Sequence, residues 1–197
     1  MIYETLSALF LFAFVSSVTP GPNNLMLLSS GTHHGFKRTL PHILGIELGF
    51  AILIMMVGVG LMNLFELYPA SHQVLKIAGA SYLVYLAYKI GTSVTPIDQP
   101  GEKSKPFTFL QAALFQWVNP KAWTMALTAI SLYAQSRQLT HVMYVALAFM
   151  IVGLPSASLW TTMGIQLKRF LKSTFQLRVL NAILALLLVS SLYPMLK

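Results

Sequence analysis

Six long apolar stretches, separated by short polar breaks, make up almost the whole chain. Each is close to the roughly 20 mostly apolar residues that a helix needs to cross a bilayer. The pattern therefore predicts an all-α membrane protein with six transmembrane helices and leaves almost nothing for a soluble domain. The predicted spans cover residues 5–28, 40–64, 73–90, 107–132, 141–165 and 177–196.

The longest polar break, residues 91–106, contains three prolines, two acids and two lysines. We expect it to be a cytoplasmic loop that joins two halves, 1–90 and 107–197, of a single transmembrane transporter domain, 1–197. Three spans per half is an odd number, so the halves would have opposite orientations, as in transporters built from inverted repeats. Aligning Pro20 with Pro120 supports this arrangement, because the two prolines then interrupt equivalent spans.

Composition and charge agree with a lipid environment. Of the 197 residues, 56% are hydrophobic and 9% charged, whereas about a quarter of a soluble domain is charged. The net charge of +8 arises from basic residues in the polar breaks, and nine of the 13 Lys and Arg follow spans one, three and five. Because positive loops remain in the cytoplasm, we expect a bacterial inner-membrane protein with both termini periplasmic, with the lipid bilayer as a partner and no nucleic acid. The apolar N-terminus has no positive n-region and no small-residue cleavage site, so it is interpreted as a span rather than a cleaved signal peptide.

Spans one and four are interrupted by proline, which removes a backbone donor and clashes with the preceding helical turn. With Thr19 or Asn119 as N-cap and proline at the first helical position, each span would restart as a second half-helix near the middle of the bilayer. The positive ends of the two half-helices would then face a shared cavity suited to a carboxylate. The alternative is that the prolines only kink helices for packing, which is the interpretation preferred for Pro155 of span five. The candidate substrate-binding residues are Thr19, Pro20, Gly21, Pro22, Asn23 and Asn24 of span one, with Gln116, Asn119, Pro120 and Lys121 of span four.

Glu47 and Lys121 are the charged residues that lie well within spans. Charges at this depth usually mark transport pathways, so Glu47 is a candidate for proton coupling or for a counter-ion to a substrate ammonium. A carboxyl reached by water, or a structural ion pair, is the alternative. Gly45 and Gly49 permit close helix approach and are expected to bring Glu47 against span one. Lys121 would be balanced by a bound carboxylate or a nearby acid, unless its side chain extends toward the interface.

The remaining polar groups indicate no enzyme chemistry. The spans contain no nucleophile elbow, and the chain contains no His-Glu-x-x-His or Walker motif, so no catalytic residue, metal or cofactor is expected. His33 and His34 are interpreted as part of a solvated loop, and Tyr82, Tyr85 and Tyr88 as packing or interfacial residues. The alternatives to a transporter of a carboxylate-bearing substrate are a transporter of another small solute or metal ion, or a membrane protein without a transport function.

Several motifs resemble those of the LysE/RhtB family of amino-acid exporters, and within it the exporters of cysteine and O-acetylserine. The resemblance implies secondary active export of a small amino acid or derivative in exchange for protons. The residues that carry it are the motif from Thr19 to Asn24, His34-Gly35-Phe36, the run from Gly45 to Phe50, the run from Gly79 to Lys89, Gln116 to Lys121, and Leu180 to Leu186.

Overall fold

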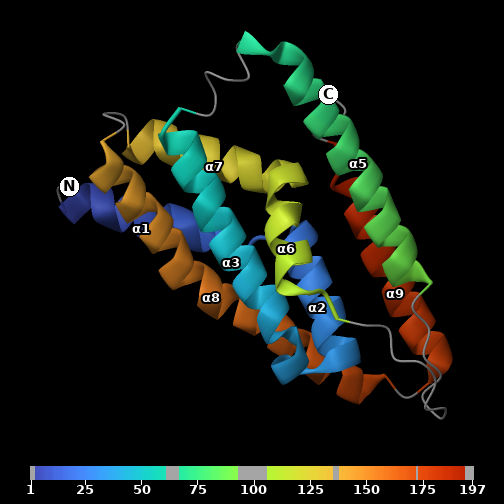
Figure 1. Ribbon diagram of the computed structural model, residues 1–197. Helices are drawn as coiled ribbons and strands as arrows, with labels where there is room; N and C mark the ends of the chain where they lie inside the picture. The colour runs from blue at the N-terminus through green and yellow to red at the C-terminus, as the bar shows by residue number, and fades with distance from the viewer. Residues whose placement is uncertain (1–2, 61–66, 93–105, 135–137, 172, 194–197) are drawn as a thin grey trace.

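The computed structural model describes residues 3–60, 67–92, 106–134, 138–171 and 173–193, and within these ranges the chain forms helices and no strand (Figure 1). Spans one and four are each divided, as the prolines predict. The elements are α1 (Tyr3–Val18), α2 (Pro22–His34), α3 (Phe36–Gly58), α5 (Pro69–Gly91), α6 (Phe109–Phe115), the 3-10 turn η1 (Gln116–Val118), α7 (Pro120–Tyr133), α8 (Leu139–Phe170) and α9 (Thr174–Ser190).

Length and composition identify α3 and α8 as helices able to cross a membrane, and the pair α1 and α2, bent by 55° at its break, counts as a third span. The side chains that face outward are as apolar as the core. Leu11, Phe14, Ile151 and Leu186 are each more than half exposed. Exposure to water would cost about 25 cal/mol for each Å² of this apolar surface, whereas lipid chains solvate it, so the fold is consistent with a membrane protein.

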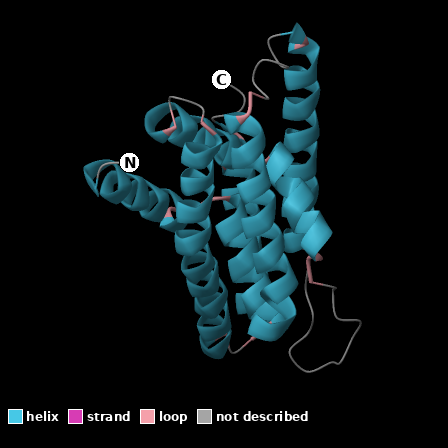
Figure 2. Cartoon of the chain, turned by 60° about the vertical axis from the view of Figure 1, so that its left-hand side comes forward, coloured by secondary structure: helices cyan, strands magenta, loops and turns pink. Residues whose placement is uncertain are grey.

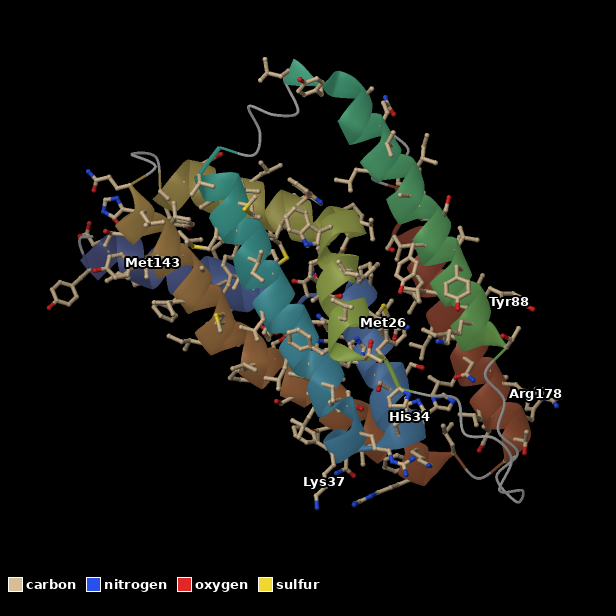
Figure 3. The ribbon with its side chains drawn as sticks, in the orientation of Figure 1. Met26, His34, Lys37, Tyr88, Met143 and Arg178 are labelled. Atoms are coloured by element: carbon tan, nitrogen blue, oxygen red, sulfur yellow. The ribbon has the colours of Figure 1, made fainter. Side chains whose placement is uncertain are left out.

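Helix α8, the longest of the described helices, packs against α1, α2 and α3, while α5 and α9 form a pair along one side (Figures 1 and 2). One apolar core joins α1, α3, α7 and α8, and a second joins α2, α5 and α9 with Phe115 of α6. The two breaks lie between these cores, where α2, η1 and α7 begin. Tyr85 and Tyr88 lie on the exposed face of α5, and Figure 3 shows Tyr88 directed away from the bundle.

Glycines set the closest helix contacts. A Cβ on Gly45 would overlap the Phe109 carbonyl, and a Cβ on Gly49 would lie 2.6 Å from the Ala113 Cα. Both glycines therefore seat α3 on α6, so the expectation that they bring α3 against span one is wrong. Helix α3 contacts α2 of span one through other residues, such as Ile43 and Ile46 beside Leu27. The close glycine contact of span one is with α8, where a Cβ on Gly31 would overlap the Thr161 carbonyl.

The interpretation of His33 and His34 as loop residues is also wrong. They form the last turn of α2, and His33 Nδ1 lies 2.8 Å from the Ser29 carbonyl oxygen. The chain turns one residue later, at Gly35, whose positive φ of 76° favours glycine.

Because α6 leaves no room beyond Gly49, we predict that Gly49→Val destabilises the protein by about 1–3 kcal/mol, the usual cost of overpacking. Thermal unfolding in detergent, followed by fluorescence-detected size exclusion, measures the loss. Leu48→Val is the matched control, because Leu48 is 40% exposed and should change little. Equal melting temperatures for the two variants would contradict the assigned α3–α6 contact.

Candidate substrate site

The break in span one is an extended turn between α1 and α2. Helix α1 ends at Val18, and the Thr19 hydroxyl donates back to the Val15 carbonyl at 2.5 Å. Gly21 is the residue before α2, with φ −168° and ψ 177°, and no side chain caps the helix. The prediction that Thr19 caps a helix beginning at Pro20 is therefore wrong. Pro22 holds the first helical position, since its missing N–H has no partner to lose there.

Asn24 and Lys121 satisfy carbonyls that this break releases. The Asn24 side-chain amide donates to the carbonyls of Ser17 at 2.8 Å and Thr19 at 2.9 Å. The Lys121 ammonium, from α7, donates to the same Thr19 carbonyl at 2.5 Å. Unpaired backbone groups cost several kcal/mol in lipid, so these bonds allow the chain to unwind inside the bundle.

Helix α8 supplies two further donors that the sequence analysis did not identify. The Ser156 hydroxyl donates to the Ser17 carbonyl at 2.9 Å, and the Trp160 indole donates to the Val18 carbonyl at 3.2 Å. The sequence contains a pattern that could have pointed to these donors, because small and polar residues recur every three or four positions along α8 from Gly153 to Gly164. The sequence analysis considered Pro155 alone and did not consider the small and polar residues around it.

The backbone groups freed at the break in span four are hydrogen-bonded in a different way. The Asn119 side chain accepts from the Lys121 backbone N–H at 3.2 Å, so Asn119 caps α7 and Pro120 begins it, as predicted. The Trp123 indole donates to the Trp117 carbonyl at 2.8 Å. With Pro20 and Pro120 aligned, Trp123 and Asn24 each bond the carbonyl three residues before their own proline.

A pair of hydrogen bonds joins the two breaks. Asn23 Nδ2 donates to Gln116 Oε1 at 2.8 Å, and Gln116 Nε2 donates to Asn23 Oδ1 at 3.2 Å. Gln116 is fully buried and also donates to the Ala112 carbonyl at 2.9 Å. The two amides therefore fix the start of α2 against η1.

A cavity of about 520 Å³, its open mouth included, lies beside both breaks. Seven of the eleven predicted site residues line it, and Thr19, Pro20, Pro22 and Pro120 do not. The lining residues are Ser16, Ser17, Gly21, Asn23, Asn24, Leu27, Ile46, Glu47, Phe50, Gln116, Asn119, Lys121, Ala122, Met125, Phe149, Gly153, Ser156 and Ala157.

The two helix N-termini at the cavity differ in their free donors. Asn119 already occupies the first N–H of α7, whereas no side chain caps α2 at Gly21. The Lys121 side chain lies directly over Gly21, where an added Cβ would be 2.6 Å from Cδ and 3.1 Å from Nζ. The positive end of α2 and the Lys121 ammonium thus act on the same part of the cavity.

Glu47 lies on the α8 side of the cavity. It is 7% exposed, and its carboxylate rests on Gly153, where any Cβ would overlap it. Among the described residues, no hydrogen-bond donor or cation is paired with this carboxylate. Phe50 and Phe149 pack edge to face at 5.2 Å beside it and make this wall apolar. The described residues contain no cluster of His, Cys, Asp or Glu that could hold a metal ion.

A cavity with polar groups from two broken helices, within a bundle that exposes many large apolar side chains, is the arrangement of a membrane transporter rather than an enzyme. The chain belongs to the LysE type translocators, whose family model matches residues 14–190. It is 35% identical over 186 residues to the cysteine/O-acetylserine efflux proteins of Escherichia coli (strain K12), Shigella sonnei (strain Ss046) and Shigella flexneri, and the match covers 93% of each chain. No solved structure matches the chain.

Because Ser156 and Trp160 satisfy carbonyls of the break, we predict that Ser156→Ala and Trp160→Phe each cost about 1–3 kcal/mol of stability, the penalty for an unpaired buried group. Thermal unfolding in detergent measures the effect. Thr162→Ala, on the exposed face of α8, serves as the control. If Ser156→Ala and Trp160→Phe were both as stable as Thr162→Ala, the break would not depend on donors from α8.

Proposed function

We propose that the chain exports a small amino acid or derivative, of the cysteine or O-acetylserine kind, across the bacterial inner membrane in exchange for protons. Membership of the translocator family and the similarity to cysteine/O-acetylserine efflux proteins support amino-acid export. The observation that carries the mechanism is the cavity, which brings together an open helix N-terminus, a lysine and a buried, unpaired carboxylate.

The proposed architecture is two inverted repeats of three spans, each beginning with a broken helix. The order of the described helices supports it, because α1–α2 and α6–α7 are each followed by two unbroken helices. Figure 3 places Lys37, His34 and Arg178 at one end of the bundle and Met143 at the other. Since basic residues gather at cytoplasmic ends, we propose that this end is cytoplasmic and that both termini are periplasmic.

In this proposal the substrate carboxylate binds at the start of α2. The free N–H groups of its first turn and the Lys121 ammonium provide the charge and the donors that a carboxylate requires. Asn23 and Gln116 hold the first turn in place and offer further hydrogen bonds. Pro20, Pro22 and Pro120, with Thr19, shape the breaks rather than contact the substrate.

Glu47 supplies the coupling in this proposal. A carboxylate buried without a partner must be neutralised, either by a proton or by a cation. Either the substrate ammonium or a proton can neutralise the Glu47 carboxylate, but the two cannot bind it at the same time. A proton entering from the periplasm therefore displaces the amino acid, which makes the exchange obligatory.

The rest of the cavity favours a substrate with a short side chain. Its walls are small where α7 and α8 approach, at Ala122, Gly153 and Ala157, and bulky at Phe50 and Phe149. A short, weakly polar group such as a thiol or an acetylated hydroxyl suits such walls, and a charged side chain would lie there without a partner.

For the purified protein in proteoliposomes, we predict transport of O-acetylserine or cysteine that Lys121→Gln reduces at least about tenfold, the value of one charge-assisted hydrogen bond. Radiolabelled flux is the measurement. Arg178→Gln, which removes an exposed cation away from the cavity, should transport normally. Absence of any amino-acid flux through the wild-type protein would overturn the proposed function.

Glu47→Gln should transport more slowly, because the amide offers the substrate ammonium no negative charge. Its remaining transport should not respond to a pH gradient, because the amide can neither bind nor release a proton. We predict that acidifying the periplasmic side accelerates export by the wild type and leaves this variant unchanged. Glu4→Gln, which removes an exposed carboxyl in the first turn of α1, is the matched control. A normal pH response in Glu47→Gln would assign coupling to another group.

A further inference from the structure

A second cavity opens beside α2, toward the end that carries Lys37 and Arg178. It encloses about 370 Å³, its mouth included, and lies between α2, the end of α5 and the segment that leads into α6. It shares no lining residue with the cavity at the breaks. Its walls are formed by Met26, Ser29, Ser30, His34, Lys89, Ile90, Pro106 and Phe107.

One polar group that lines this cavity has no partner. The Ser29 side chain is 7% exposed, and its hydroxyl makes no hydrogen bond within the described residues. Buried polar groups in native proteins normally have partners. The Ser29 hydroxyl is therefore available to donate a hydrogen bond to a ligand in the cavity. His42 stacks on Phe107 and has both ring nitrogens buried and unpaired, but it lies behind the wall and does not line the cavity.

The electrostatic field at the cavity is positive. The Lys89 ammonium lies 5.2 Å from the centre of the Phe107 ring, and His42 stacks on that ring at 5.0 Å. Lys89, Arg38 and Lys168 all act electrostatically on His34 at the cavity wall. No carboxylate among the described residues lines the cavity or acts on His34. An anion in the cavity would be attracted by the field and could accept a hydrogen bond from the Ser29 hydroxyl.

We propose that this second cavity is a cytoplasmic subsite that holds the substrate carboxylate before it reaches the breaks. The inference rests on the proposed amino-acid export and adds a second binding position to it. Lys89 supplies the charge, and Ser29 supplies a hydrogen bond from the buried wall. At 1.5 Å per residue, Ser29 lies about 9 Å along α2 from Asn23, so the two subsites are separate steps on one helix.

The shared helix is the reason to assign this subsite to the substrate rather than to a lipid headgroup. Leu27 lines the cavity at the breaks, while its neighbours Met26 and Ser29 line the second cavity. A carboxylate that leaves Ser29 therefore needs to pass only two turns of α2 to meet the free N–H groups at its start. A lipid phosphate bound here would obstruct that route.

The chain has no cysteine, so Ser29→Cys introduces a single, nearly isosteric reporter. We expect an anionic methanethiosulfonate to modify this cysteine about ten times faster than a cationic one, as a positive cavity attracts anions. Added O-acetylserine should slow the modification in nanodiscs of neutral lipid. Equal rates for the two reagents, or protection by anionic lipid alone, would overturn the proposal, the latter identifying a headgroup site.

Transport provides a second test, with inverted membrane vesicles that expose the cytoplasmic face. We expect Lys89→Gln to raise the KM for O-acetylserine about tenfold at unchanged maximal rate, and Lys89→Arg to retain most of the affinity. Lys37→Gln, which removes an exposed cation from the same end, should behave as wild type. An unchanged KM in Lys89→Gln would remove the subsite while leaving amino-acid export intact. If the wild type transports no amino acid but Ser29→Cys is still protected by O-acetylserine, the export proposal fails and the binding site stands.

Discussion

The structure depends on the carbonyls that span one releases where it unwinds. In lipid, each unpaired carbonyl would cost several kcal/mol, and the carbonyls of Ser17, Val18 and Thr19 face this penalty together. Their donors come from α2, which follows the break directly, and from α7 and α8, which are distant in the sequence. The break therefore exists only in the assembled bundle, and the packing of α8 against α2 through Gly31 and Gly164 is what holds its donors in register.

This constraint gives the two breaks unequal roles. Asn119 caps α7 from within its own segment, so the positive end of α7 is partly used before any ligand arrives. The start of α2 has no side-chain cap, and the nearest cation, on Lys121, is engaged with the Thr19 carbonyl at the edge of the cavity. A carboxylate in the cavity would compete with that carbonyl for the lysine. Substrate binding would then loosen one of the bonds that stabilise the break, which links occupancy of the site to the conformation of span one.

Apolar periodicity and proline were sufficient to predict the helices and the positions of both breaks, since each is a local property of the chain. The same local rules predicted the cap at Asn119 but failed at Thr19, where Pro22, two residues after Pro20, holds the first helical position. Gly45 and Gly49 were recognised as a contact surface, but spacing alone does not specify the partner helix. Ser156 and Trp160 were missed for a related reason, because their partners are backbone atoms 139 and 142 residues away.

Charge balance connects the two cavities in the proposed transport cycle. An amino acid enters as a zwitterion, so the site at the breaks must provide for both charges, and Lys121 and Glu47 lie in one cavity without forming an ion pair with each other. The second cavity has lysine and histidine but no carboxylate among the described residues, so it attracts the carboxylate end and leaves the ammonium free. The ammonium is then attracted toward the cavity at the breaks, which Glu47 of α3 lines. The unequal composition of the two subsites therefore favours movement of the amino acid toward the breaks. Only the inner subsite, where the carboxylate of Glu47 is buried, requires a proton to release the bound amino acid.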